Sequence, residues 1–215
     1  MTLSALSKTV IGACFFALSS VGAANASTVS FTFDGVAPSG TTQTYSAGAY
    51  SVDVTAVGGN ITRFSNDAIG VGPNSTFSGT EIDALLFGTE ALQFDFSSEI
   101  SLLDAVIFES GNGTDTVQVT NLDTSETASM VVVNTGAGRG VAGEDKYATF
   151  DFTAVGSTFT TVGSSFLFEV LSSTGLYQGV AIQSISVAPV PLPASLPLLI
   201  AGLGGFVALR RRKAA

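Results

Sequence analysis

The chain of 215 residues contains no histidine, no tryptophan and a single cysteine, Cys14. Histidine is the commonest general base, the usual partner of a serine or cysteine nucleophile and a frequent zinc ligand. Its absence argues against the common catalytic triads and most transition-metal sites. Because no thiol follows Cys14, the remaining chain can form neither a disulfide nor a thiol nucleophile, which is common for exported bacterial domains.

Basic residues are also scarce, with eight Lys and Arg against 17 Asp and Glu, for a formal net charge of −9. All acidic residues lie between Asp34 and Glu169, where only Arg63, Arg139 and Lys146 are basic, so this region carries a net charge of −14. Such a surface repels nucleic acid and anionic lipid, and we expect neither as a partner of this region.

The N-terminus has the three parts of a cleavable export signal. Lys8 supplies a short positive region, residues 10–21 are apolar, and Ala24 and Ala26 form an A-x-A cleavage site. We expect a signal helix in residues 1–26, removed by signal peptidase after passage through the export translocon. A lipoprotein signal ending at Cys14 is the alternative, but only five residues separate Lys8 from Cys14.

The C-terminus predicts a single membrane-spanning helix. Residues 192–209 carry no charge, and a helix of this length is about 27 Å long, close to a bilayer core of about 30 Å. The cations that follow should remain in the cytoplasm as a stop-transfer signal: Arg210, Arg211, Arg212 and Lys213. We expect a Pro-rich motif or stalk at 189–195, a transmembrane core at 196–209 and a basic tail at 210–215. A buried helix of a soluble domain is the alternative, and it would show polar positions at helical spacing.

Residues 27–188 predict one all-β ectodomain, an antiparallel β-sandwich or jelly roll. Short stretches alternate apolar and polar residues, as in Val29, Phe31 and Phe33, and Gly-rich turns separate them. We expect a hairpin turn at residues 58–60, strands at 91–96 and 101–109 with a turn at 97–99 between them, and strands at 158–162 and 177–187. The strand at 101–109 should be central, and Phe150 and Phe152 should face inward.

Acidic residues near turns are the candidate metal ligands. Calcium binds six to eight oxygens, and the Gly- and Asn-rich loops favour it at Asp67, Glu81 and Asp83. The pairs Glu81 with Asp83 and Glu144 with Asp145 are candidates for glycoside hydrolysis, but their spacing does not distinguish them from surface charges. We expect no catalytic residue, and no cofactor unless calcium binds.

Carbohydrate binding is compatible with the fold class, since lectins share it. Sugar rings usually stack on aromatic side chains, and the candidates are Tyr45 and Tyr177. Their alternative role is that of ordinary strand residues.

The C-terminal tail resembles the VPLPA-CTERM variant of the PEP-CTERM sorting signals of Gram-negative bacteria. The motif is complete and stands directly before the apolar run and the basic end: Val190, Pro191, Leu192, Pro193 and Ala194. The resemblance implies recognition by an exosortase-type membrane transpeptidase, transient anchoring in the inner membrane, and transfer to the cell surface or extracellular matrix. It also implies a link to exopolysaccharide and biofilm. A Gram-positive sortase signal would require Thr-Gly after Leu-Pro-x, and a GPI signal would end in its apolar run.

Three functions follow as expectations. The first is a non-enzymatic surface or matrix protein, the second is a carbohydrate-binding module that calcium assists, and the third is a glycoside hydrolase. A matrix polysaccharide is the expected partner in the second case.

Overall fold

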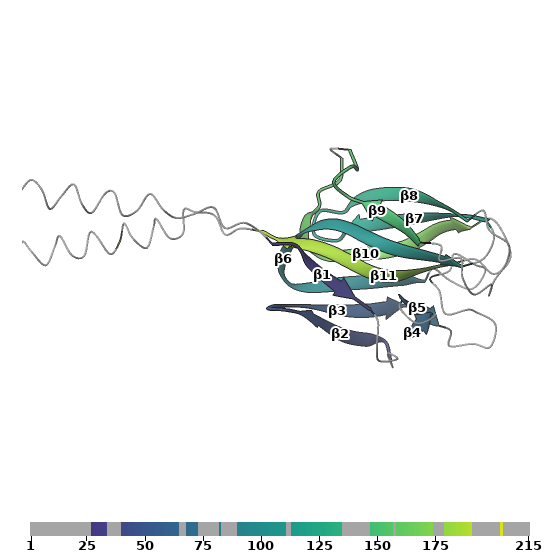
Figure 1. Ribbon diagram of the computed structural model, residues 1–215, viewed down its shortest axis with the longest axis horizontal. Helices are drawn as coiled ribbons and strands as arrows, with labels where there is room; N and C mark the ends of the chain where they lie inside the picture. Colours follow the sequence, from purple (N-terminus) through teal and green to yellow (C-terminus); the bar gives the residue numbers. More distant parts are fainter. Residues whose placement is uncertain are drawn as a thin grey trace, which may run out of the picture.

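The described part of the chain is almost entirely β-structure. The computed structural model describes residues 27–33, 40–64, 68–72, 82, 90–110, 113–134, 147–156, 158–173, 179–190 and 203. Every strand pairing in it is antiparallel, which confirms the all-β, antiparallel prediction (Figure 1). The strands are β1 (Val29–Thr32), β2 (Thr42–Ala47), β3 (Tyr50–Val57), β4 (Asn60–Phe64), β5 (Ala68–Gly72), β6 (Ala91–Ser110), β7 (Gly113–Asn121), β8 (Glu126–Asn134), β9 (Tyr147–Asp151), β10 (Val162–Ser173) and β11 (Gly179–Pro189).

The central element is β6, a strand of 20 residues that joins two predicted strands. Its first half pairs with β3 and β10, and its second half pairs with β11 and β9. Between the halves, residues 97–99 are exposed, and the pairing with β10 jumps from Asp95↔Ser165 to Ile100↔Gly163. The turn predicted at 97–99 is therefore an irregularity inside one strand, which lets β6 serve two groups of strands.

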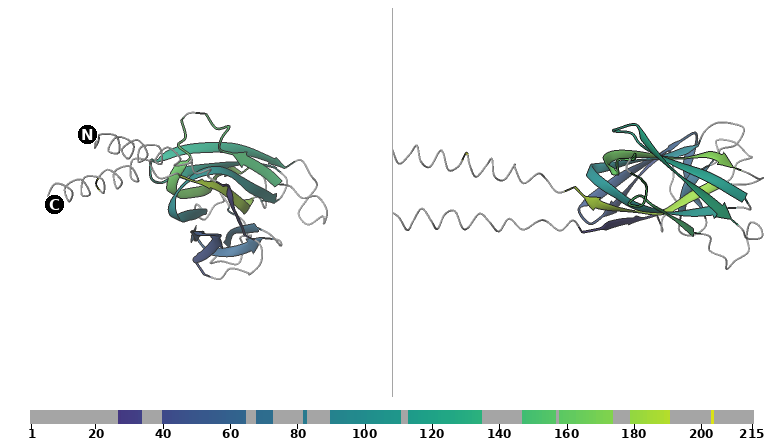
Figure 2. Two further views of the ribbon diagram at one scale, coloured as in Figure 1. Left: turned by 60° about the vertical axis from the view of Figure 1, so that its left-hand side comes forward. Right: turned by 90° about the horizontal axis from the view of Figure 1, so that it is seen from above.

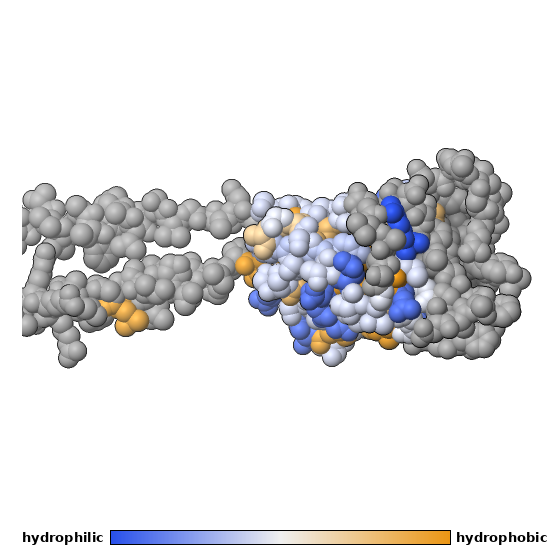
Figure 3. Space-filling model, turned by 90° about the horizontal axis from the view of Figure 1, so that it is seen from below, coloured by the Kyte–Doolittle hydropathy of each residue, from blue (hydrophilic) through white to orange (hydrophobic). Residues whose placement is uncertain are grey.

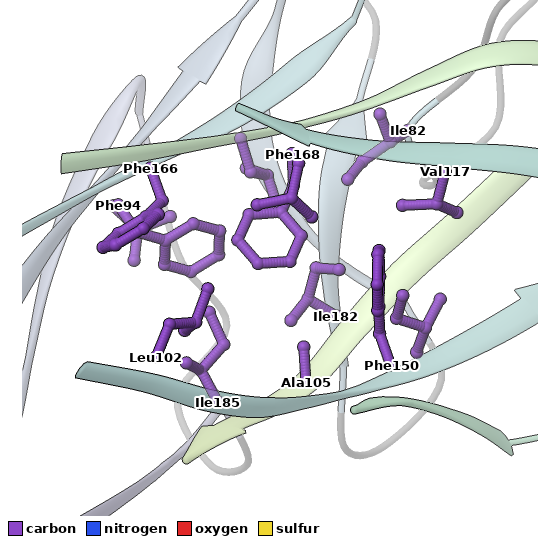
Figure 4. Close-up of a cluster of buried hydrophobic side chains, with 14 of the residues drawn as sticks. Ile82, Phe94, Leu102, Ala105, Val117, Phe150, Phe166, Phe168, Ile182 and Ile185 are labelled. Carbon is purple, nitrogen blue, oxygen red and sulfur yellow. The ribbon is translucent and has the colours of Figure 1, made fainter. Parts of the chain in front are cut away.

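The strands form two groups that share β6. One group runs β2-β3-β6-β10-β7-β8, and the other contains β9, β6, β11, β1, β5 and β4 (Figure 2). Apolar side chains from both groups meet between them (Figure 4). Phe94 of β6 packs edge to face against Phe168 of β10, with ring centroids 5.1 Å apart. Alternation along each strand puts these side chains inward, as period-two patterning predicts.

The connection from β3 to β4 differs from the predicted hairpin. β3 pairs with β2 and β6, whereas β4 pairs with β5, so the glycines at 58–59 carry the chain between the two groups. Gly58 has φ of 89°, and a Cβ on Gly59 would lie 2.2 Å from the carbonyl oxygen of Gly72. A Gly-Gly pair permits a crossing between strand groups and a hairpin equally well. Here the close approach of residue 59 to Gly72 of β5 requires a glycine at that position.

Two predicted strand bounds also change. The predicted strand at 158–162 is a bend that buries Phe159, and only Val162 belongs to a strand, β10. The last strand, Gly179–Pro189, ends two residues later than predicted, and the predicted residues 177–178 lie outside the described residues. The inward positions expected for Phe150 and Phe152 are confirmed, because both rings are buried and stack 4.4 Å apart.

Candidate functional site

The first and last strands of the domain are neighbours. β1 pairs with the end of β11, with Val29 opposite Val187 and Thr32 opposite Ser184. Because the pairing is antiparallel, the chain enters β1 and leaves β11 at the same end of the domain, where the start of the purple strand meets the end of the yellow-green strand (Figure 1). We call this end the junction pole, and it comprises residues 27–29, 97–99, 122–125, 158–161 and 188–190.

The predicted sorting motif begins directly at the junction pole. Pro189 still pairs with Ile100 of β6, and Val190 is half-buried. The ladder therefore continues to the residue before the motif, and Pro189, predicted as the first residue of a stalk, is the last residue of β11. The other motif residues lie outside the described residues: Pro191, Leu192, Pro193 and Ala194.

A buried amide ties the β7–β8 turn to the segment before β10 at this pole. The side chain of Asn121 is fully buried, and its Nδ2 donates to the carbonyl oxygens of Thr160 at 2.8 Å and Val162 at 2.9 Å. Its Oδ1 accepts from the backbone N–H of Asp123 at 3.0 Å and Thr124 at 3.3 Å. Every polar atom of the amide is therefore bonded, as burial requires.

Two carboxylates extend the same connection. Asp123 accepts a hydrogen bond from the backbone N–H of Ser164 at 2.5 Å and from its hydroxyl at 3.1 Å. Glu126 accepts from the backbone N–H of Thr160 at 2.6 Å, and hydrogen bonding from Thr160 holds the pKa of Glu126 below its ordinary value. Sequence reasoning missed this cluster, although Asn-Leu-Asp-Thr between two alternating stretches is a turn signal.

A second polar arrangement crosses the outer side of the first strand group. Asp53 of β3 lies directly opposite Asp95 of β6. Thr44 of β2 donates to Asp53 at 2.6 Å, while Gln93 at 2.9 Å and Ser165 of β10 at 2.5 Å donate to Asp95. Like charges directly opposite one another destabilise a sheet. The three hydrogen-bond donors to Asp53 and Asp95 are neutral, so they do not cancel the charge of either carboxylate. We call Thr44, Asp53, Asp95 and Ser165 the carboxylate row.

The carboxylate row could not be read from the sequence because, although β2 and β3 are consecutive, β6 and β10 lie far from them and from each other in the chain. Their outward positions do follow from the alternation. Seen from the side on which β2 and β3 lie in Figure 1, the described surface is mostly pale to blue, with small orange areas (Figure 3). A hydroxyl- and carboxyl-bearing surface of this kind can donate and accept hydrogen bonds over several strands.

The predicted calcium ligands are not brought together in the described residues, because Asp67, Glu81 and Asp83 all lie outside them. Glu144, Asp145 and Tyr177 also lie outside. Between Glu81 and Asp83, Ile82 is buried and forms an isolated antiparallel bridge with Val180 of β11. A search of the described residues finds no group of three or more acidic, histidine or cysteine side chains that could hold a metal ion.

Tyr45, a candidate for stacking a sugar, is half-buried in β2. Its ring packs edge to face on Phe33 with centroids 4.9 Å apart, and burial raises the pKa of its phenol. The described position therefore corresponds to the alternative role, a strand residue packed against the core.

The export and membrane predictions concern the two ends of the chain. Ala24, Ala26 and the stop-transfer cations at 210–213 lie outside the described residues, and among those that are described no helix is long and apolar enough to span a bilayer. Comparisons with family models, with curated proteins and with solved structures gave no match.

Proposed function

We propose that this protein is an exported, non-enzymatic component of the cell surface or extracellular matrix, delivered by an exosortase-type sorting signal. Residues 1–26 direct export, residues 27–188 fold as the exposed domain, and Val190 to Ala194 are read by the transpeptidase. The two strand groups enclosing an aromatic core support a jelly-roll β-sandwich as the architecture of that domain.

The observation that carries this proposal is the pairing of β1 with β11. It puts both ends of the ectodomain, Val29 and Pro189, at the junction pole. A domain with both ends at one pole can stand on a membrane while the rest of its surface stays exposed.

Intact-mass measurement of the protein recovered from the cell surface tests the proposal. We expect a mass that lacks both residues 1–26 and everything beyond the sorting motif. Pro191→Ala together with Pro193→Ala should retain the tail, while Pro197→Ala, a proline outside the motif, should be processed normally. Recovery of surface protein that still carries residues 210–215 would show a permanent anchor and overturn sorting.

The carboxylate row favours a second candidate, a module that binds matrix polysaccharide through hydrogen bonds. Carboxylates and hydroxyls at neighbouring positions are the groups that bind sugar hydroxyls, and calcium at Asp67, Glu81 and Asp83 would assist them. Calorimetric titration with matrix polysaccharide, with and without EDTA, tests this candidate. Heat that disappears in Asp53→Asn and Asp95→Asn would support it, and no heat in either condition would remove it.

A further inference from the structure

The edge strand β8 is longer than the other edge strands, of which β1 and β2 have four and six residues and no charge. Within the described residues, β8 pairs only with β7 and ends the sheet order. The edge strands β4 and β9 have five residues each and carry Arg63 and Asp151, and short, charged edges resist pairing with other chains. β8 has nine residues, no proline, glycine or cation, and one charge, Glu126, at its start.

The side chains of β8 leave its free edge open to another strand. Val131 is 58% exposed, the largest exposure among the large hydrophobic strand side chains that the structure describes, and Thr127 and Ser129 are exposed on the same face. Ala128 and Val132 face the core. All nine residues hold a continuous register with β7, and the buried amide of Asn121 fixes the turn before them. β8 is thus a long template for β-addition that holds a continuous register and has its one charge at its start.

We propose that β8 pairs antiparallel with β8 of a second copy of this chain, in a register centred on Met130. In this register Ser129 lies opposite Val131, Ala128 opposite Val132, and Glu126 opposite the neutral Asn134 of the other copy. No like charges face each other along the ladder, and Ala128, Met130 and Val132 of both copies continue one apolar row. The sequence of β8 is therefore complementary to itself, as a two-fold interface requires.

This pairing has a consequence for the two junction poles. β8 starts at the junction pole, beside the turn at 122–125, and runs away from it. An antiparallel partner runs the opposite way, so its junction pole lies at the other end of the dimer. If each copy is held at its junction pole, which rests on the proposed function, the dimer joins two opposing surfaces and not two neighbours on one membrane.

Sedimentation of the purified full-length chain in detergent tests the dimer. We expect a monomer–dimer equilibrium that Val131→Lys weakens about tenfold or more, because two lysines then crowd the paired edge. The control is Leu171→Lys, which puts the same charge on a similarly exposed residue, 50% exposed, of the interior strand β10. Circular dichroism of both variants shows whether they fold. A chain that is monomeric at all concentrations, or unaffected dimerisation in folded Val131→Lys, would overturn the proposal.

Cysteine cross-linking tests the register without relying on a disruptive variant. In a Cys14→Ser background, Met130→Cys should form a disulfide-linked dimer on oxidation, since the two residues meet at the two-fold axis. Thr44→Cys, on the edge strand β2, is the matched control and should stay monomeric. Equal cross-linking at both positions would overturn the register.

Vesicle clustering tests the opposed geometry. Liposomes carrying the full-length chain should cluster, and those carrying Val131→Lys should not. Dimers in detergent without clustering of wild-type vesicles would refute the bridging arrangement. Dimerisation is measured separately from tail processing, so a failure of the sorting proposal and a failure of the dimer give different results.

Discussion

Replacement of Asn121 by alanine should destabilise the domain more than any exposed substitution in the same turn. The amide is fully buried and makes four hydrogen bonds, two of them to the carbonyl oxygens of Thr160 and Val162 at 2.8 and 2.9 Å. These bonds join the β7–β8 turn to the segment that enters β10. Their loss would release the turn and leave two carbonyl groups without their donor.

The magnitude follows from the two kinds of bond. Each donor bond contributes about 1 kcal/mol net, and the carbonyl group of half-buried Val162 adds about 1–2 kcal/mol when it loses its donor, whereas that of exposed Thr160 can bond to water. The bonds to the turn N–H groups add little, because that turn is exposed and water can replace the acceptor. We therefore expect Asn121→Ala to lower the free energy of unfolding by about 2–4 kcal/mol. In a chain of this size that corresponds to a fall in Tm of about 5–12 °C.

Urea denaturation of the full-length chain, followed by circular dichroism, measures this loss. Asn121→Asp keeps an acceptor for the turn but has no donor, so it should be at least as destabilising as alanine at neutral pH. Thr124→Ala, which removes an exposed hydroxyl with bonds of 3.4 Å, should change the free energy by less than about 0.5 kcal/mol. Equal stabilities for Asn121→Ala and Thr124→Ala would refute the structural role of the amide.

Three further predictions concern pH, backbone packing and the core. Hydrogen bonding from Thr160 lowers the pKa of Glu126 in the folded state below its ordinary value of 4.5, so its stabilising effect is complete above that value and is lost as pH falls through the folded pKa. The urea midpoint of the wild type should therefore fall more than that of Glu126→Gln between pH 6 and pH 3, and parallel curves would contradict this. Gly59→Ala should destabilise by about 1–3 kcal/mol, because its Cβ would meet the Gly72 carbonyl. An unchanged melting temperature would refute that close approach. Phe94→Ala should cost about 3–5 kcal/mol in the same assay, since its ring is fully buried, and a loss below about 1 kcal/mol would contradict its central place.

Local patterning predicted most of the strands, but it missed β2, wrongly predicted a strand at 158–162 and did not give the strand partners. Alternation at Val52 and Val54 or at Phe166 and Phe168 reports which side chains face inward, and all four are buried. The crossing at residues 58–59 was wrongly predicted as a hairpin, because two glycines allow both paths and the choice depends on the distant Gly72.

The candidate functional features also differ in whether their residues are contiguous in the sequence or are brought together only by strand pairing. The proposed sorting motif is contiguous, so sequence alone is enough to propose it. The carboxylate row and the Asn121 cluster join segments up to 70 residues apart, and their composition is ordinary for surface turns and strands. Only pairing reveals that Asp53 and Asp95 face each other, because nothing in either local stretch specifies the other.

The place of β11 in the sheet determines how a force on the tail would reach the domain. β11 lies between β6 and β1, and its pairing with β6 extends from Gly179 to Pro189. Tension applied at Val190 acts along the strand, so it loads many ladder hydrogen bonds in shear at once, whereas tension across an edge would break them one by one. In the proposed dimer, the tension between two opposed junction poles also runs along β8. Tension between the two surfaces therefore runs parallel to both β11 and β8. It is carried by the ladder hydrogen bonds that hold these two strands in the sheet.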